Sequence, residues 1–276
     1  MSNSRLASGT RRAYSTMATS ARAAVALAAV FMLTSCSVAD PIVVTPKVMA
    51  APANATKKLD TSGFHYTPLS DPELDTHGYQ ITYVNLATGA HIGSANERDS
   101  RPALSLIKLY IAHYVFEHGT KEDKELAQVM ISKSDDSAAD ELFATYPESI
   151  DSVAKDFNLD STKSDPAWGY SVTSTYDVAY FLAQLKTFDP SSQVLKTMRE
   201  AKVKASDGTT QDFGTVVLPG VLGSKWAWSN DKDLHSSASF GHNFVAVAAV
   251  HGDAKTLTKL VEYQLLGEGK NTEFGG

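Results

Sequence analysis

The chain has 276 residues, of which 43% are hydrophobic, and its formal net charge is −6. This length and apolar content suffice for one sizeable domain with a single core, or for two small lobes that share one. The acidic balance argues against a nucleic-acid-binding protein, and the presence of one cysteine excludes an intrachain disulfide.

The first 35 residues have the composition of a signal peptide. They contain four arginines and no acidic residue, and residues 23–33 form an uninterrupted apolar run. A basic start followed by a short apolar stretch is typical of export signals. The run is about half as long as the roughly twenty residues that a transmembrane helix needs. We therefore predict a cleaved signal peptide over residues 1–35, with Met1 or Met17 as the start.

The apolar run ends in Leu33-Thr34-Ser35-Cys36. This order resembles the bacterial lipobox, in which the cysteine is acylated and becomes the new N-terminus. We predict a lipoprotein that is anchored through Cys36 to the outer face of the cell membrane. The alternative is a plain signal peptide followed by a chance cysteine. Removal of residues 1–35 changes the formal net charge from −6 to −10, because it removes four basic residues.

Residues 36–76 are predicted to form a tether. They hold five of the ten prolines of the chain among small and polar residues, and so many prolines argue against a packed element. The tether prediction is compatible with packing of its last part against the domain. The folded domain is expected to occupy residues 77–276.

The domain is expected to open with a β-hairpin, because residues 80–86 and 91–94 are rich in β-formers and flank a turn at 87–90. Residues 104–117 are apolar almost all round, which predicts a buried helix. Shorter helices are expected near 121–133, 136–145 and 147–157.

In the second half of the domain, Ser174 and Asp177 form a predicted capping box for a helix that ends near Thr187. Pro190 is expected to open another helix. A loop-rich crossing follows over residues 202–222. Three strands are expected over residues 222–229, 235–240 and 243–251, and a final helix over about 257–265. The order of hairpin, helical block, strands and helix predicts an α+β domain with an antiparallel sheet flanked by helices.

Ser105 and Lys108 are spaced like a catalytic pair. On a helix, residues i and i+3 lie on the same face. A desolvated lysine has a lowered pKa and can act as a base, which a serine hydroxyl needs to become a nucleophile. The alternative is a helix-capping serine beside a lysine that reaches solvent. The same spacing recurs at Ser152 and Ser229 without an evident function, so the motif alone does not decide.

Two later segments give this pair a context. Ser134 opens a Ser-Asp-Asp-Ser-Ala-Ala-Asp run, and Lys225 opens Lys-Trp-Ala-Trp-Ser. With the preceding hairpin, these motifs resemble the S-x-x-K, S-D-N and K-T-G motifs of the penicillin-recognising serine enzymes, the class A β-lactamases and D,D-peptidases. The resemblance covers residues 78–267 and implies a β-lactamase/transpeptidase-like fold.

The resemblance also implies a role for each residue. Ser105 would be the acylated nucleophile, Lys108 the base and Ser134 a proton relay. Lys225 would attract a substrate carboxylate and polarise Ser134. The backbone N–H groups of Ser105 and Trp228 would form the oxyanion hole. No cofactor or metal is implied, and the eight histidines form no H-E-x-x-H motif.

Four departures from the family weaken the expectation of β-lactamase activity. Asp136 replaces an asparagine; its carboxylate cannot donate a hydrogen bond and would hold Lys108 in its charged form. Trp226-Ala227 replaces Thr-Gly. The Ser105–Ser134 interval of 29 positions predicts a reduced all-helical lobe. No E-x-x-L-N glutamate is present to activate a deacylating water, and Asp165 is only a weak candidate.

The indoles at Trp226 and Trp228 leave two interpretations open. Residues i and i+2 of a strand point to the same side, so both rings could form hydrophobic cover. Equally, they could stack on substrate together with Ala227.

Two functions therefore remain as hypotheses. The first is a monomeric serine acyltransferase or hydrolase that acts on a cell-wall peptide, amide or ester through a Ser105 acyl-enzyme. The second is a catalytically degenerate lipoprotein of the same fold that binds an envelope component or assists envelope assembly. Efficient β-lactamase turnover is not expected.

Overall fold

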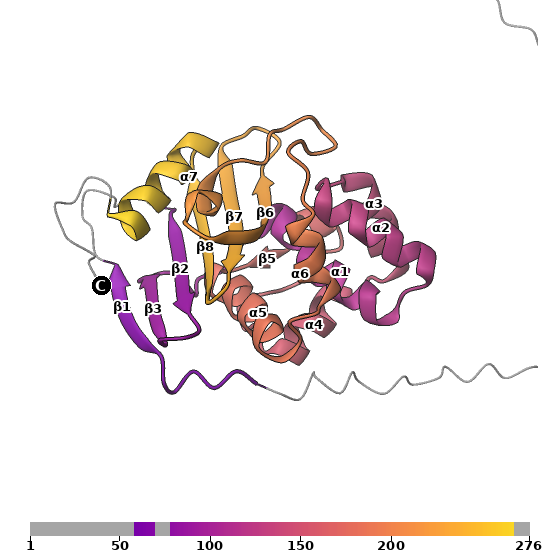
Figure 1. Cartoon of the computed structure of the whole chain (residues 1–276). Coiled ribbons are helices and arrows are strands. Elements are labelled where there is room, and N and C mark those ends of the chain that lie inside the picture. The colour runs from indigo at the N-terminus through magenta and orange to yellow at the C-terminus, as the bar shows by residue number, and fades with distance from the viewer. Residues whose placement is uncertain (1–57, 70–77, 268–276) are drawn as a thin grey trace, which may run out of the picture. The chain divides into compact units, whose positions relative to one another are not determined.

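The computed structural model describes residues 58–69 and 78–267. Its centre is a six-stranded sheet in the order β1-β3-β2-β8-β7-β6 (Figure 1). The strands are β1 (His65–Leu69), β2 (Gln80–Asn85), β3 (Ala90–Ser94), β6 (Val221–Trp228), β7 (Leu234–Gly241) and β8 (Phe244–His251). The first and last thirds of the domain thus build one sheet, since β2 pairs directly with β8.

The helices fall between the two groups of strands. They are α1 (Lys108–His118), α2 (Lys121–Ser132), α3 (Asp136–Thr145), α4 (Ser149–Phe157), α5 (Thr175–Phe188) and α6 (Gln193–Arg199), with α7 (Ala254–Val261) at the end. Two short strands, β4 (Arg101–Pro102) and β5 (Val172–Thr173), pair beside them. Among the described residues, no helix is long and apolar enough to cross a bilayer.

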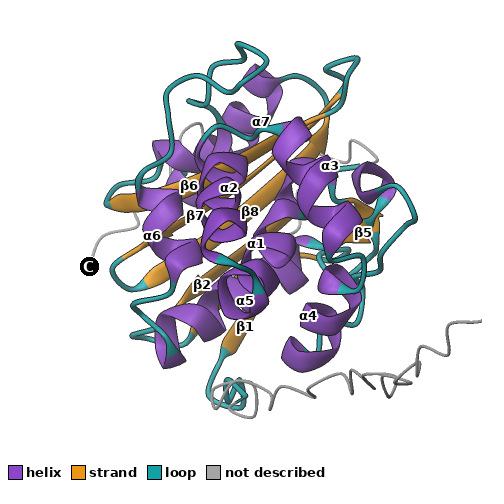
Figure 2. Cartoon of the chain, turned by 90° about the vertical axis from the view of Figure 1, so that its right-hand side faces the viewer, coloured by secondary structure: helices purple, strands orange, loops and turns teal. Residues whose placement is uncertain are grey.

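The sheet separates two apolar clusters, because successive strand residues face opposite sides. Ala227, Val245 and Val247 join the large cluster that contains α1 and α5. Trp226, Ala246 and Ala248 join the smaller cluster that contains α7. Helices therefore cover both faces of the sheet (Figure 2). This alternation decides which side chains of β6 can reach the helical block.

The expected α+β fold with helices around a sheet is confirmed, but the sheet is mixed. β1 runs parallel to β3, whereas the other neighbouring strands are antiparallel. β1 lies inside the segment predicted as a tether. Proline is compatible with an edge strand, which explains why Pro68 does not prevent pairing. The tether prediction left room for packing near the domain, and proline content alone does not show where a free sheet edge lies.

The N-terminus of α5 tests one local prediction. Ser174 caps the helix, since its hydroxyl accepts a hydrogen bond of 3.0 Å from the backbone N–H of Asp177. The expected capping box is only half formed, because the Asp177 carboxylate instead accepts from Thr162 and Ser161.

We expect Ser174→Ala to lower the free energy of unfolding by about 1 kcal/mol, because the N–H of Asp177 loses its acceptor. Denaturant titration would measure this. Ser192→Ala is the matched control, since Ser192 is also a buried N-cap residue but makes no side-chain capping bond to α6. Equal losses in the two variants would contradict the capping account.

Candidate active site

Ser105 lies in a short 3₁₀ turn, Leu104–Leu106, directly before α1. The expected helix thus begins at Lys108, four residues later than its apolar pattern indicated. Leu104 has a left-handed backbone conformation, with φ of 51°, which is costly for a residue with a side chain. Such strain is common at functional sites. The turn places Ser105 on a cavity wall while Lys108 enters the core.

Lys108 is completely buried and is held by the helical block. Its Nζ donates to the backbone carbonyl of Ser134 at 2.9 Å and to Asp136 Oδ1 at 2.5 Å. Burial lowers the pKa of Lys108, and the nearby Asp136 carboxylate opposes that shift. Within the described residues, the Ser105 hydroxyl makes no hydrogen bond to this amine or to any other group. Catalytic hydrogen bonds are often unformed in the absence of substrate.

Ser134 and Lys225 form the second contact of the site. Lys225 lies on β6, and its side chain points to the face of the sheet opposite to that of its neighbour Trp226. Its Nζ donates to Ser134 Oγ at 2.6 Å and to the Trp226 carbonyl at 2.9 Å. Ser134 has φ of 52° in the turn between α2 and α3. Lys225 is fully buried, and this burial, followed by the charge of Lys108, holds its pKa well below the ordinary value.

Asp135 and Asp136 begin α3. Asp135 is its N-cap and accepts from the backbone N–H of Ala138 at 2.8 Å and from Ser206 Oγ at 2.6 Å. The Ser206 hydrogen bond, the larger cause, and that from Ala138 lower the pKa of Asp135. The Asp136 side chain is 70% exposed, so its carboxylate joins buried Lys108 to the cavity.

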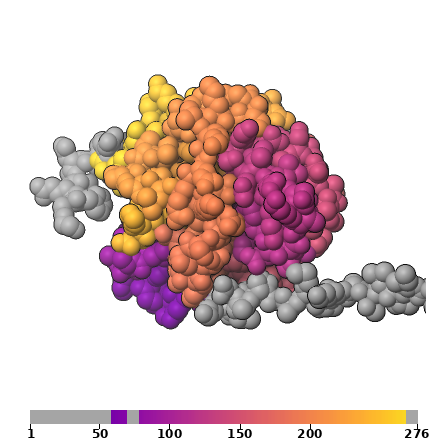
Figure 3. Space-filling model, turned by 45° about the vertical axis from the view of Figure 1, so that its right-hand side comes forward, coloured from indigo at the N-terminus to yellow at the C-terminus, as the bar shows by residue number. Residues whose placement is uncertain are grey.

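These elements surround a cavity of about 780 Å³. Ser105, Ser134 and Asp136 line it together with residues from two loops, whereas Lys108 and Lys225 lie behind the wall and reach it through their hydrogen bonds. In the space-filling view, the magenta helical block packs against the orange segment that holds α6 and the following loop (Figure 3). Four side chains predicted from separate motifs are therefore brought to one region.

The proposed oxyanion donors have suitable backbone positions. The backbone N–H of Ser229 donates to the Leu234 carbonyl at 3.0 Å, and Trp228 is opposite His235 in the same antiparallel register. In an antiparallel pair, hydrogen-bonded and non-hydrogen-bonded residue pairs alternate. Ser229 and Leu234 form a hydrogen-bonded pair, so Trp228 and His235 do not. The Trp228 N–H therefore points away from β7, toward the free edge of β6. No described residue accepts a hydrogen bond from the Ser105 N–H.

The two indoles have different surroundings. Trp226 is buried in the cluster around α7, where its Nε1 donates to the Phe213 carbonyl at 2.9 Å. Ala227 is fully buried in the other cluster. Trp228 packs against the same cluster as Trp226 but also lines the cavity, and its Nε1 donates to Asp207 Oδ2 at 3.0 Å. Of these two indoles, only Trp228 is therefore placed to contact a substrate in the described cavity.

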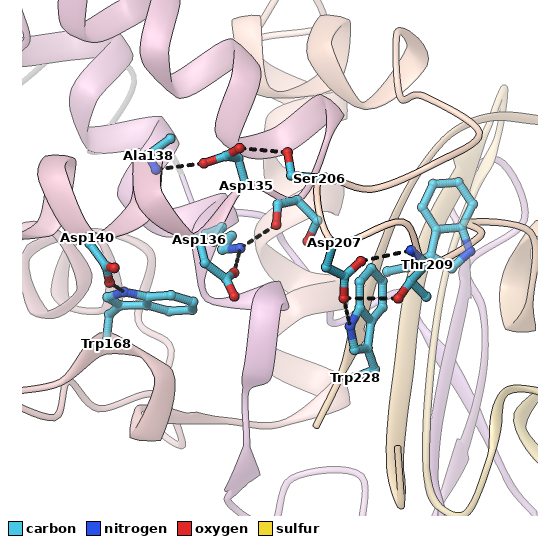
Figure 4. Close-up of polar contacts among 12 residues, drawn as sticks. Asp135, Asp136, Ala138, Asp140, Trp168, Ser206, Asp207, Thr209 and Trp228 are labelled. Atoms are coloured by element: carbon cyan, nitrogen blue, oxygen red, sulfur yellow. Dashed lines mark hydrogen bonds and ion pairs between the residues drawn. The ribbon is translucent and has the colours of Figure 1, made fainter. Parts of the chain in front are cut away.

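Sequence reasoning missed the second aromatic wall and the loop that carries Asp207. Trp168 and Tyr170 lie on a 3₁₀ turn, and Tyr170 is 79% exposed. Trp168 Nε1 donates to Asp140 at 2.6 Å, and Lys108 Nζ lies 4.8 Å from the centre of its ring. Figure 4 shows Asp136 between Trp168 and the pair formed by Asp207 and Trp228. Such loops have no periodicity to reveal them.

The sequence matches no protein-family model and no curated protein. Solved structures do match. Penicillin-binding protein D2 from Listeria monocytogenes, bound to cefotaxime, has 18% identity and a TM-score of 0.53 over 72% of this chain and 100% of its own. A β-lactamase from Desulfarculus baarsii has 11% identity and a TM-score of 0.55 over 73% and 95%. A β-lactamase from Sphaerobacter thermophilus has 13% identity and a TM-score of 0.54 over 72% and 95%.

The chain has the fold of serine β-lactamases and penicillin-binding proteins. These similarities establish the β-lactamase fold alone, and activity has to be argued from the site. On this fold, the three motifs occur in the expected order and their side chains gather at one cavity. In the part of the chain that the structure describes, no three His, Cys, Asp or Glu side chains gather as metal ligands would.

Proposed function

We propose that the protein is a serine acyltransferase or hydrolase that forms an acyl-enzyme on Ser105 with a cell-wall peptide, amide or ester. The observation that carries this proposal is the Lys225–Ser134–Lys108 connection beside Ser105, in which two fully buried lysines bracket one serine. Burying a lysine amine is costly. Two buried amines beside one serine therefore favour a role in proton transfer over a structural role.

The chemistry follows from these positions. Ser105 Oγ attacks the substrate carbonyl, and the serine proton passes to Lys108 in its neutral form, which burial favours. The Ser105 and Trp228 N–H groups stabilise the negative oxygen of the tetrahedral intermediate. Ser134, polarised by Lys225, delivers a proton to the leaving group as the carbonyl–leaving-group bond breaks, and takes in its place the proton that Lys108 received from Ser105. Water or a second nucleophile then releases the acyl group.

Covalent labelling tests this proposal. We expect a fluorescent fluorophosphonate to add one adduct mass to the wild-type domain, located on Ser105, and none to Ser105→Ala. Intact-mass spectrometry and peptide mapping would measure it. Ser137→Ala is the matched control, because Ser137 is an exposed serine of the same cavity. Labelling of Ser105→Ala at the wild-type level would disprove the acyl-enzyme.

A second candidate is a non-catalytic binding or envelope assembly protein of the same fold. The Lys108–Asp136 contact favours it, since an ionised partner keeps an ammonium protonated. Under this alternative, Ser105→Ala retains function in the cell and no probe labels the protein.

We also propose that the protein is a lipoprotein, anchored through Cys36 on the extracytoplasmic face of the membrane. Its support is the lipobox-like sequence after a short apolar run; these residues lie outside those that the structure describes. We expect Cys36→Ala to move the protein from the membrane fraction to the soluble fraction, as measured by fractionation and immunoblotting. Undiminished membrane retention would count against the anchor.

A further inference from the structure

The charges that line the cavity are unbalanced. Asp135, Asp136 and Asp207 contribute three carboxylates, whereas among the described lining residues only Lys232 contributes an ammonium group. Hydrogen bonds from neighbouring groups lower the pKa of Asp135. For Asp207, burial raises the pKa, but hydrogen bonds from Thr209 and Trp228 and the charge of Lys232 lower it overall. These two carboxylates are therefore negative at neutral pH.

Lys232 is already engaged. Its Nζ lies 3.4 Å from Asp207 Oδ2, donates to Thr209 Oγ1 at 2.9 Å and lies 4.6 Å from the centre of the Trp228 ring. A carboxylate ligand would have to compete with Asp207 for this ammonium group. One exposed lysine also gains little from an ion pair in water. Lys232 therefore does not make the cavity attractive to anions.

Of the two buried lysines, Lys108 pairs with Asp136 and offsets that carboxylate, which leaves Asp135 and Asp207 as the carboxylates of the lining that carry the inference. Neither Lys108 nor Lys225 lines the cavity. Lys225 Nζ is bonded to Ser134 and the Trp226 carbonyl, and Lys108 Nζ to Ser134 and Asp136. Trp226, the next residue of β6, is directed to the far face of the sheet. Because tryptophan has no hydroxyl, position 226 offers no hydroxyl group to an anion in the cavity.

From this arrangement we infer that the site selects acyl donors whose leaving group carries no carboxylate, and discriminates against donors in which a carboxylate lies beside the scissile bond. The inference rests on the proposed Ser105 acyl transfer and names its substrate class as uncharged esters or amides. A like charge in a partly desolvated cleft is strongly unfavourable. Trp168, Tyr170 and Trp228 instead provide ring surfaces that suit an uncharged group.

A matched pair of substrates tests the inference. The 3-carbamoylphenyl and 3-carboxyphenyl esters of N-acetylglycine have similar shapes and differ in the charge of the leaving group. We expect kcat/KM, measured by phenol release from the wild-type domain at low salt, to be about tenfold or more higher for the carbamoyl ester. Higher salt should reduce this ratio, because salt screens charge repulsion. Equal values, or a preference for the carboxylate ester, would overturn the inference.

Asp207→Asn should reduce the ratio by about threefold or more, because it removes one lining carboxylate. Glu141→Gln is the control that should leave the ratio unchanged, since Glu141 is exposed on α3 and does not line the cavity. An unaltered ratio in Asp207→Asn would contradict the electrostatic origin of the selectivity.

A separate binding measurement distinguishes a failure of the proposed acyl transfer from a failure of the proposed selectivity. Binding of both esters to Ser105→Ala can be followed by intrinsic tryptophan fluorescence, because Trp168 and Trp228 line the cavity. Tighter binding of the carbamoyl ester, without any Ser105 adduct in the wild type, would retain the selectivity and reject the proposed chemistry. Binding of neither ester, or tighter binding of the carboxylate ester, would overturn the selectivity.

Discussion

Asp136→Asn is expected to increase the rate of Ser105 acylation by about tenfold or more. In the wild type, the Asp136 carboxylate lies 2.5 Å from the Lys108 ammonium group and opposes the lowering of its pKa by burial. An amide removes that opposition. Each unit by which the Lys108 pKa falls toward neutral pH increases its neutral fraction about tenfold. The amide can also donate a hydrogen bond to a substrate carbonyl, which the carboxylate cannot.

The increase would be measured as the pseudo-first-order rate of fluorophosphonate adduct formation by intact mass. The pH profile should shift with it: the alkaline rise in the acylation rate should begin at lower pH in Asp136→Asn, because Lys108 loses its proton there. Glu141→Gln removes a carboxylate from the same helix without touching Lys108 and should have no effect. A slower Asp136→Asn enzyme with an unchanged pH profile would show that Asp136 does not restrain Lys108.

Lys225→Met is expected to reduce acylation about 100-fold or more, as is usual when a proton-transfer group is lost. Lys225 is the donor to Ser134 Oγ, and methionine cannot polarise that hydroxyl. The same variant should be more stable at pH 7, by about 1–4 kcal/mol, because an apolar side chain of similar length replaces a buried lysine, whose amine costs free energy to bury. Loss of activity with a gain in stability would distinguish a functional lysine from a structural one.

The pH dependence of that stability has a definite sign. Burial places the pKa of Lys225 in the folded protein well below the ordinary value of 10.5. Between these two values the unfolded chain binds more protons than the folded one, so the stability of the wild type rises with pH. Below the folded pKa the full burial cost remains. The advantage of Lys225→Met should therefore be larger at pH 7 than at pH 10 and shrink as pH rises toward 10.5.

Denaturant titrations of both proteins at pH 7 and pH 10 would measure the difference. Lys196→Met on the exposed side of α6 is the control and should show neither the gain in stability nor its pH dependence. If Lys225→Met were less stable than the wild type at pH 7, Lys225 would be holding the fold together through its hydrogen bonds.

The periodicity of the sequence was sufficient for most of the elements. The hairpin of β2 and β3, the strands β6 to β8 and the helical block were all expected within a few residues of their observed ends. Such elements are predictable because burial of one face leaves a regular spacing of apolar residues. The edge strand β1 was not predictable in this way, because it depends on the free edge of β3, whose residues pair with β1 from 25 positions further along the chain.

Within the site, the sequence alone determined the order of the motifs and the chemical types at Ser105, Lys108, Ser134 and Lys225, because these are local properties. Only the tertiary structure decided which groups meet. It directed Trp226 to one face of β6 and Lys225 to the other. The alternation of a strand shows that neighbouring side chains point to opposite faces, but it does not show which of them faces the helices. The tertiary structure also joined Lys108 to Asp136 and brought Trp168 and Asp207 to the cavity, through contacts between segments whose separation in sequence carries no periodic signal.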